Sequence, residues 1–525
     1  MQHSQQRAHT SALQFSKQET FDETGTAMSY LPFISLETWI LLISFICIFV
    51  WYGHSTYGVF EKLGIPGPKP VMYWGTIGRF NHVYYLDDNE CAKKYGRVWG
   101  CYELRRPMLV VKDPDMLKII LVKECFTYFT NRRNFRLNGE LYDAVNIAMD
   151  DQWRRIRNIV TPSFASGRIK EMFHTIKHHS HKLTESLRSK AHNEEVVTAK
   201  DFFGPYSMDA MVSCGFSLDL DSIKDPTNPV ITHASKIFRF PIPLFMFQGF
   251  FPFFLPLLEL LGVSLFSKSS TTFFKAVIEK IRAQRHGKSR EKFPDILQNF
   301  INSQTEHTEH SKEKQNKGLT DHEIISQVTM LLFAGYETSA TTLVFLAYNL
   351  ARNPEVMKRL QKEIDSTFPN KGPVQYDSLM HMEYLDSVIN ECLRLYPPAA
   401  RLDRIAKETV KINGITIPKD MIVMIPIYAL HHDPELWPEP EEFKPERFSK
   451  ENKQHIQPYT YLPFGVGPRN CLGMRLALVV IKLALVEVLQ EYSFLACDET
   501  EIPLTMDPLG LVGPLRPIKL KLVAR

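Results

Sequence analysis

The segment Pro463–Gly473 holds the residues whose types and spacing could do chemistry. It reads PFGVGPRNCLG and runs directly into MRLALVVIKLALVEVLQ, a strongly helical stretch, so Cys471 lies at the start of a helix. Free backbone N–H groups and the positive end of the helix dipole favour a thiolate there, and a thiolate is what iron needs as a ligand. Gly465, Gly467 and Gly473 allow a tight loop whose backbone can approach a planar cofactor and donate hydrogen bonds to sulfur.

A lone cysteine beside a helix is more often a small buried hydrophobic residue than an iron ligand, so the neighbouring residues are needed to distinguish the two. The loop resembles the signature of the cytochrome P-450 superfamily, which runs Phe, two residues, Gly, one residue, Arg, one residue, Cys, one residue, Gly. The residues that match every fixed position are Phe464, Gly467, Arg469, Cys471 and Gly473. The resemblance implies haem b as cofactor, with Cys471 as the axial thiolate ligand of the haem iron and Phe464 beside it.

A Glu-x-x-Arg motif lies upstream, as the resemblance requires. Glu391 and Arg394 stand three residues apart, which places them on one helix face. An isolated pair of this kind is commonly a surface pair of little value. In the family a second arginine completes a buried triad beneath the haem, and Arg447 in the stretch PERF matches it. The resemblance assigns these three residues to folding and haem retention.

The stretch AGYETS, residues 334–339, lies within a long helical pattern. Gly335 costs about 1 kcal/mol there relative to alanine, and threonine adds χ1 strain, so another interaction must offset that cost. By resemblance Ala334 borders the haem, and the stretch opens a groove in which Glu337 and Thr338 deliver protons to dioxygen. A threonine whose hydroxyl only bonds back to its own helix is the alternative.

Haem propionates are anionic, so several cations must converge on them. Trp153 and Arg157 match the family pattern of Trp, three residues, Arg. By resemblance Arg132, Arg404 and Arg469 join them. A surface arginine is the alternative for each.

The elements that must position these residues are mainly helical. Thr320–Glu323 forms a capping box ahead of an apolar-periodic segment that ends at Arg352, before Asn353-Pro354. At 1.5 Å per residue this helix is roughly 48 Å long, enough to cross the whole body. Short strands are expected at Arg97–Tyr102, Met108–Lys112 and Val410–Ile417, the last with a turn at Asn413-Gly414. The sequence predicts a mainly α fold with small β-sheets, and the resemblance implies one large cytochrome P-450-type domain that encloses haem.

A membrane anchor precedes this domain. Residues 30–52 carry Glu37 as their only charge and are long enough to span roughly 30 Å of hydrocarbon as a helix. A cleaved signal peptide is the alternative, but the run lies far from the start and lacks a small-residue cleavage site. Lys62 and Lys69 follow it and acidic residues precede it, which places the body in the cytosol.

Four segments therefore follow one another along the chain. Residues 1–29 form a polar extension that we expect to be disordered, 30–52 the transmembrane anchor, 53–70 a proline-rich hinge or plain turn, and 71–525 the haem domain. The polar stretch 303–318 is expected to be an exposed loop.

Composition excludes two classes of function. The net charge is only +4, and no basic run is interleaved with aromatic residues, so nucleic-acid binding is excluded. The eight cysteines form no CxxC pair or dense framework, which argues against a disulfide scaffold or a zinc site and favours a reducing compartment.

Longer stretches resemble family three, subfamily A, from roughly Met28 to the end, among them KLGIPGPKP, FTNRRNF and MEYLDSVINECLRLYP. The resemblance implies a monooxygenase of the endoplasmic reticulum membrane that oxidises drugs, steroids and other lipophilic molecules. Its electrons would come from NADPH through NADPH–cytochrome P-450 reductase, with cytochrome b5 as a second partner. By the same resemblance the substrate pocket is lined by Phe135, Asn146, Arg239, Phe240, Phe333, Ala399 and Leu511.

Two parts of the chain are expected to contact lipid, substrate or a redox partner. The phenylalanine-rich stretch 238–266 is broken by prolines, so it packs in the core or faces lipid and substrate. Arg154 and Arg155 are expected to dock an acidic reductase.

The alternative functions are a haem-thiolate isomerase of a lipid endoperoxide and a non-catalytic haem sensor. Neither needs the proton relay of Glu337 and Thr338, which favours the monooxygenase.

Overall fold

The computed structural model describes residues 35–225, 227–237, 241–285, 295–304 and 318–525. The chain divides into two compact units, Met1–Gly53 and His54–Arg525. The predicted extension at 1–29 and nearly all of the predicted loop at 303–318 lie outside the described residues.

The first unit contributes the apolar helix α1 (Leu36–His54). Its mean hydropathy of 1.8 suits a membrane span, and only 6% of its apolar stretch is buried. Within the described residues α14 (Asp321–Arg352) is also long and apolar enough to cross a membrane, but 61% of its stretch is buried in the body. A third span would require α10 and α11, which are bent by 103°, to count as one.

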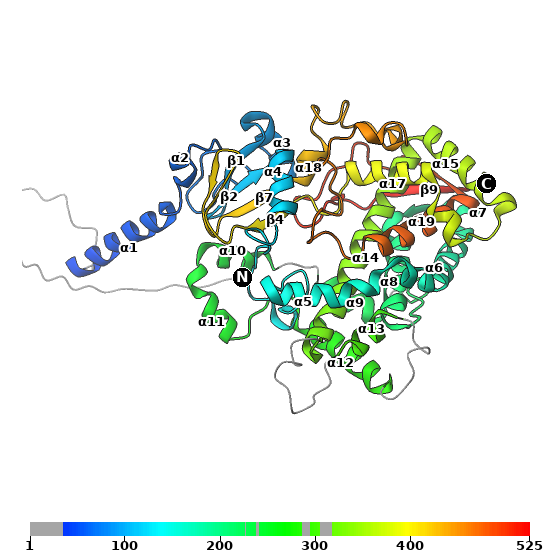
Figure 1. Ribbon diagram of the computed structural model, residues 1–525, viewed down its shortest axis with the longest axis horizontal. Coiled ribbons are helices and arrows are strands. Elements are labelled where there is room, and N and C mark those ends of the chain that lie inside the picture. The colour runs from blue at the N-terminus through cyan, green and yellow to red at the C-terminus, as the bar shows by residue number, and fades with distance from the viewer. Residues whose placement is uncertain (1–34, 226, 238–240, 286–294, 305–317) are drawn as a thin grey trace, which may run out of the picture. The chain divides into compact units, whose positions relative to one another are not determined.

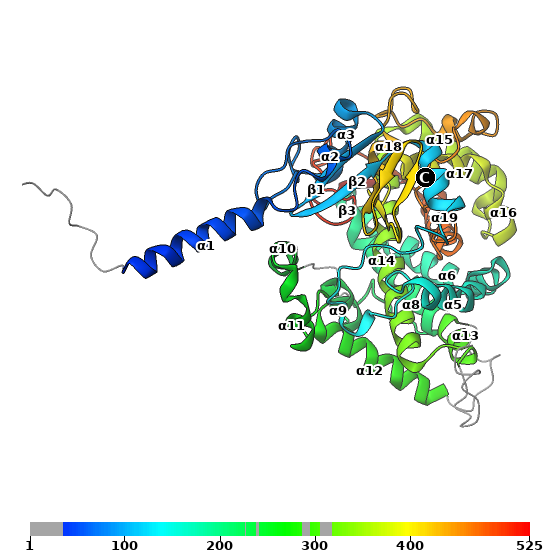
Figure 2. The same cartoon turned by 60° about the vertical axis from the view of Figure 1, so that its left-hand side comes forward.

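The second unit is mainly helical (Figures 1 and 2). In both views its four-stranded sheet lies to one side of most of the helices. Its α-helices are α2 (Val59–Lys62), α3 (Tyr84–Tyr95), α4 (Pro114–Lys118), α5 (Asp150–Val160), α6 (Ser166–Ser186), α7 (Arg188–His192), α8 (Ala199–Phe216), α9 (Pro229–Ile237), α10 (Ile242–Phe250), α11 (Leu255–Leu260), α12 (Lys268–Arg285), α13 (Ile296–Asn302), α14 (Asp321–Arg352), α15 (Pro354–Thr367), α16 (Tyr376–Met380), α17 (Glu383–Leu395), α18 (Ile427–His431) and α19 (Met474–Glu491).

The strands form small sheets, as predicted. The largest has the order β1-β2-β7-β4, a second has β3-β9-β8, and β5 pairs with β6 as a hairpin across Asn413-Gly414. Their bounds are β1 (Val98–Glu103), β2 (Arg106–Val111), β3 (Val196–Thr198), β4 (Leu402–Ile405), β5 (Val410–Ile412), β6 (Ile415–Ile417), β7 (Ile422–Ile425), β8 (Tyr492–Leu495) and β9 (Lys519–Ala524). All three predicted strand regions are confirmed, to within two residues at their ends.

The long central helix α14 begins and ends where the sequence predicts. The Thr320 hydroxyl accepts a hydrogen bond from Glu323 N at 3.1 Å, and the Glu323 carboxylate accepts one from Thr320 N at 2.9 Å. This capping box satisfies backbone N–H groups that the first turn of a helix leaves unpaired. Asn353-Pro354 then ends the helix and starts α15.

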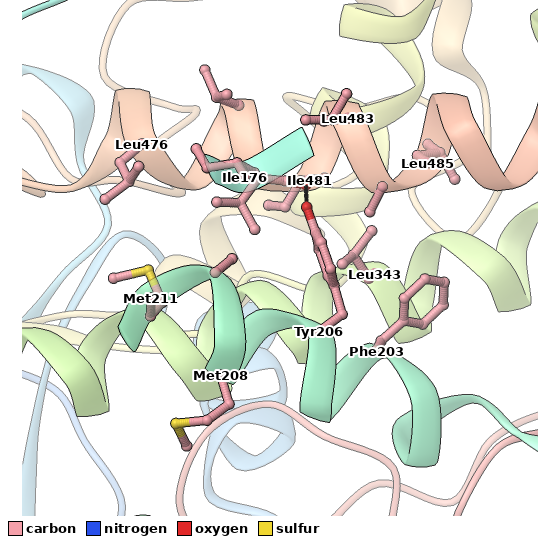
Figure 3. Packing of buried hydrophobic residues seen from close by; sticks show 14 of the residues in the cluster. Ile176, Phe203, Tyr206, Met208, Met211, Leu343, Leu476, Ile481, Leu483 and Leu485 are labelled. Atoms are coloured by element: carbon pink, nitrogen blue, oxygen red, sulfur yellow. Dashed lines mark hydrogen bonds between the residues drawn. The ribbon is translucent and has the colours of Figure 1, made fainter. Parts of the chain in front are cut away.

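The helical core is built where α6, α8, α14 and α19 pack together (Figure 3). Phe203 and Tyr206 on α8 belong to the same buried cluster as Leu343 on α14 and Ile481 on α19. The Tyr206 hydroxyl donates to the carbonyl of Val480 at 2.8 Å, so a polar atom in this core has a partner. These contacts fix α14, which contains the AGYETS stretch, and α19, which follows the cysteine loop.

The proline-rich segment after α1 is packed onto the body. Phe60 and Ile65 are buried in the cluster around the large sheet, and Gly100 N in β1 donates to Pro66 O at 2.9 Å. A Cβ added at Gly67 would lie 2.2 Å from Gly100 O, so only glycine fits there. Within the predicted hinge 53–70, the part from Phe60 to Gly67 therefore belongs to the folded domain.

We predict that Tyr206→Phe lowers the free energy of unfolding by about 1 kcal/mol, because the substitution removes one buried hydrogen bond and changes little else. The measurement is the midpoint of denaturant unfolding. Tyr95→Phe, at a half-buried position whose hydroxyl has no hydrogen bond among the described residues, is the matched control. Equal midpoints for the two variants would contradict the role given to this bond.

Candidate functional site

One cavity gathers most of the predicted site residues. A single face of α14 forms part of its wall, since the residues that α14 contributes recur every three or four positions. They are Gln327, Met330, Leu331, Ala334, Gly335, Thr338, Ser339 and Thr342. The cysteine loop, α5, α19 and the segment 398–402 also line the cavity.

The cysteine loop has the tight backbone that its glycines predict. Gly465 and Gly467 have φ angles of 67° and 77°, in the left-handed region that favours glycine. A Cβ at Gly467 would lie 2.0 Å from Leu121 O, so this position also excludes a side chain by contact. Cys471 N donates to Phe464 O at 2.8 Å, which closes the loop and turns both residues to the cavity.

Cys471 has exposed surface although it lies deep within the body, because it lines the cavity. Burial raises the pKa of its thiol, and the backbone N–H groups of Gly473 and Met474 and the guanidinium groups of Arg132 and Arg157 oppose that rise. The predicted donors to sulfur are thus present. A Cβ at Gly473 would meet nothing within 4 Å among the described atoms, which leaves room for a planar group beside the sulfur.

Four arginine side chains lie close enough to one another to repel, and three of them line the cavity that holds Cys471. Arg132, Arg157 and Arg469 line the cavity. Arg404 is 1% exposed and carries mutual repulsion with Arg132. Burial, followed by that repulsion, lowers the pKa of Arg404 to about 10, and burial with the neighbouring arginines lowers the pKa of Arg469 to about 9.

Two of these guanidinium groups also keep one nitrogen without a hydrogen-bond partner, although Arg132 Nη2 donates to Arg469 O and Arg404 Nη1 to Asp403 O. Arg132 Nε and Arg404 Nε are buried and unpaired among the described residues. Like charges that repel each other and leave donors unused are costly unless an anion lies between them. The two propionates of a haem would supply such anions, so these side chains fit that cofactor.

The neighbours of these arginines hold them in place. Arg469 donates to Thr130 O and Ala148 O, both at 2.8 Å, and lies over the ring of Trp153. Arg157 donates to the side chain of Asn470 at 2.8 Å, a contact that the sequence motifs did not indicate. Trp153 itself lines the cavity.

The predicted triad is assembled, with Glu391 and Arg394 fully buried and Arg447 partly buried. Arg394 donates two hydrogen bonds of 2.8 Å to Glu391, and Arg447 Nε donates a third of 3.3 Å. Arg394 also donates to His431 O at 2.9 Å, and His431 Nε2 accepts from Leu462 N at 2.8 Å. His431 therefore links the triad to the start of the cysteine loop. Sequence reasoning missed it, because no spacing rule relates it to either motif.

The AGYETS stretch is held by α8. A Cβ at Gly335 would lie 2.3 Å from the end of the Met211 side chain, and Ser207 Oγ donates to Tyr336 O at 2.9 Å. These contacts offset the low helix propensity of the stretch. Thr338 lines the cavity, and its hydroxyl donates to Ala334 O at 2.7 Å, the back-bond weighed above as the alternative. That bond leaves the oxygen free to accept.

Glu337 is directed elsewhere. Its carboxylate forms an ion pair with Lys200 at the start of α8 and is absent from the cavity wall. Sequence reasoning missed Lys200, which no motif marks. The part of Glu337 in proton delivery remains a prediction.

The predicted pocket residues divide into three groups. Asn146 and Ala399 line the cavity, as does Phe464. Phe135, Phe333 and Leu511 are absent from its described wall: Phe135 packs near Phe245, and Phe333 is buried against Phe274. Arg239 and Phe240 lie outside the described residues.

Comparisons with known proteins agree with this geometry. The family model "Cytochrome P450" matches residues 65–522. Cytochrome P450 3A30 of Fundulus heteroclitus is 57% identical over 94% of this chain and 99% of its own length. Cytochrome P450 3A40 of Oryzias latipes is 56% identical over 95% and 99%, and Cytochrome P450 3A28 of Bos taurus 48% over 95% and 98%. The chain therefore belongs to the cytochrome P450 family of haem-thiolate monooxygenases.

Proposed function

We propose that the chain binds haem b in this cavity through Cys471 and oxidises lipophilic molecules, among them xenobiotics and steroids, with electrons from NADPH. The observation that carries the proposal is that one thiol, in a glycine-built loop, shares a cavity with arginines that form no ion pair with a carboxylate among the described residues. When bound, the haem supplies the oxygen chemistry, and the thiolate ligand favours cleavage of the O–O bond.

The protein's own residues would then bind, orient and supply protons. Arg132, Arg157, Arg404 and Arg469 would hold the propionates. Mostly apolar side chains, such as Val145, Leu331 and Ala399, would place a lipophilic substrate and exclude water. Thr338 would hold a water molecule in the cavity and pass a proton from it, with Glu337 as the supply behind it.

The proposed location is the endoplasmic reticulum membrane, with α1 as a single span and the body in the cytosol. A second lipid contact is supported by the exposed apolar side chains of α10, η4 (Pro252–Phe254) and α11, where Phe253, Leu260 and Leu261 are 61%, 84% and 65% exposed. Such a patch on a folded domain usually marks a binding surface.

NADPH–cytochrome P-450 reductase is the proposed electron donor, and cytochrome b5 a second partner. Of the two arginines expected to dock the reductase, Arg154 is half-exposed, pairs with its helix neighbour Asp151 and lies over the ring of Phe126. Arg155 pairs with Glu323 and donates to Gly318 O, and its part in reductase docking stays a prediction. The isomerase and sensor functions are disfavoured by the family membership.

Cys471→Ser is expected to abolish the strongly red-shifted Soret band of the reduced carbon monoxide complex, because a serine hydroxyl cannot be held ionised as a thiolate can. The absorbance spectrum of the purified protein is the measurement. Cys497→Ser, which changes a thiol away from the cavity, should keep the band. A red-shifted band in Cys471→Ser would refute the ligand assignment.

Thr338→Ala should fold and keep haem, since alanine raises helix propensity and one small polar group is lost. Proton delivery would be misdirected, so product per NADPH oxidised should fall severalfold while hydrogen peroxide release rises. Turnover driven by added peroxide bypasses oxygen reduction and should fall less. Thr329→Ala, on the same helix but off the cavity, is the control. Unchanged coupling in Thr338→Ala would mean that another group carries the proton.

Deletion of residues 1–27 should leave membrane association intact, whereas deletion of 28–52 should weaken it without abolishing it. The remaining attachment would come from the apolar surface of α10 to α11. Sedimentation of the expressed protein with microsomes measures both. Adding Leu260→Ser and Leu261→Ser to the second deletion should release the protein. Complete release without them would show that this surface does not contact lipid.

A further inference from the structure

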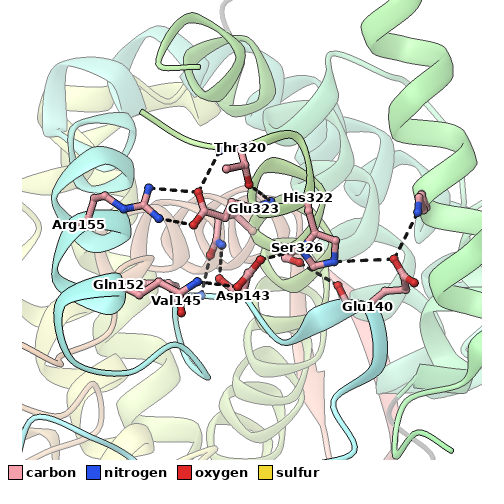
Figure 4. A network of polar contacts seen from close by, with 11 residues as sticks. Glu140, Asp143, Val145, Gln152, Arg155, Thr320, His322, Glu323 and Ser326 are labelled. Carbon is pink, nitrogen blue, oxygen red and sulfur yellow. Dashed lines mark hydrogen bonds and ion pairs between the residues drawn. The ribbon is translucent and has the colours of Figure 1, made fainter. Parts of the chain in front are cut away.

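The first two turns of α14 hold the segment 139–146 (Figure 4), which is called the wall because its last two residues, Val145 and Asn146, line the cavity. Ser326 Oγ donates to Glu140 O at 2.9 Å, and Gln327 Nε2 donates to Asp143 O at 2.7 Å. Val145 N donates back to Gln327 Oε1 at 2.6 Å. Val145 and Gln327 line the cavity, together with Asn146. The position of this wall therefore depends on its contacts with α14.

His322, on the same helix, adds side-chain contacts to that wall. Its Nδ1 lies 2.8 Å from a carboxylate oxygen of Asp143, and its Nε2 lies 3.8 Å from the carboxylate of Glu140. The ring stacks on Tyr142 with the centroids 4.3 Å apart. The other oxygen of Asp143 accepts from Gln152 Nε2 at 2.6 Å. One imidazole thus contacts three side chains of the segment.

The charge of this ring changes what it can bind. An ionised carboxylate only accepts hydrogen bonds, so Nδ1 must carry a proton to bond Asp143. In the neutral ring Nε2 then presents a lone pair toward Glu140, which gives no bond. A second proton converts Nε2 into a donor, and the cationic ring can pair with both carboxylates. Protonation therefore strengthens the contact between α14 and the wall.

The other charged groups of the network are already paired. Lys275 of α12 lies 3.4 Å from the Glu140 carboxylate, Arg155 of α5 pairs with Glu323, and Arg282 of α12 pairs with Asp321 at 2.8 Å. Histidine is the side chain type that ordinarily changes charge between pH 5 and 8, whereas these other types keep theirs.

We propose that His322 is a positioning residue that holds the wall 139–146 against α14 more firmly at acid pH than at neutral pH, and that it thereby sets the pH dependence of ligand exchange with the cavity. The first half rests on the contacts of the ring and on the charge change that histidine ordinarily undergoes between pH 5 and 8. The second half rests also on the proposed function, because it takes the cavity to be the substrate pocket.

Backbone hydrogen exchange of the full-length haem-loaded protein tests the first half. Wild type and His322→Gln are compared at each pH, so that the intrinsic pH dependence of exchange cancels. At pH 6 the wall 139–146 of the wild type should exchange roughly two- to fivefold more slowly than that of the variant, the factor expected of a partly exposed ion pair. At pH 8 the two should agree. If wild type and His322→Gln exchange at the same rate at pH 6 as well as at pH 8, the proposal is overturned.

Ligand dissociation tests the second half, with a neutral steroid as probe and the spin-state shift of the Soret band as the signal. Wild type should release the steroid about two- to fivefold faster at pH 8 than at pH 6. His322→Gln should be fast at both, and His322→Arg, which keeps a positive charge, slow at both. His174→Gln, an exposed histidine of α6, should follow wild type. A wild-type profile in His322→Gln would overturn the second half.

The two arms also separate this proposal from the proposed function. If the steroid gives no spectral shift at any pH, the proposed substrate class is wrong, and the exchange arm still decides whether His322 controls the wall.

Discussion

The buried carboxylate of Glu391 is the group on which the site's architecture depends. A fully buried charge is stable only where each oxygen has partners. Glu391 receives them from Arg394, Arg447 and the backbone N–H of Lys444. Because Arg394 also binds His431 O, and His431 binds Leu462 N, the chain of contacts runs from α17 to the loop that carries Cys471. Burial, followed by His432 and Arg394, lowers the pKa of His431 well below its ordinary value, so this link stays neutral and keeps its acceptor.

The arginines around the cavity differ from Glu391 because their charges are not balanced by partners among the described residues. Arg132 and Arg404 lie close enough to repel each other, and each keeps a buried nitrogen without a partner among the described residues. Natural proteins break local rules of charge pairing mainly where a ligand restores them. The triad, whose charged groups are paired, thus stabilises the fold. The arginines, whose charges are not balanced, would bind the anionic propionates of the proposed haem.

The motifs that the sequence could predict are those with fixed spacing. The cysteine loop, the Glu391–Arg394 pair and the capping box of α14 are local patterns, and the structure places all three as expected. What the sequence could not supply is the rotation of a helix about its own axis. Phe333 and Glu337 each precede a cavity residue of α14 by one position, which turns them about 100° away from the cavity face. Phe333 accordingly packs against α12, and Glu337 reaches Lys200 on α8.

The order in which the chain supplies the cavity wall has a consequence for folding. The residues that line the cavity range from Arg132 to Ile481 in the sequence. The strand β3, in the first half of the chain, pairs with β9 near the C-terminus. Contacts between residues so far apart require closure of long loops, which slows folding and delays their formation. The cavity is therefore complete only after the last helix has docked. A cofactor that bridges the two halves of the wall would capture the nearly folded chain and draw the equilibrium toward the native state, as any ligand of the folded form does.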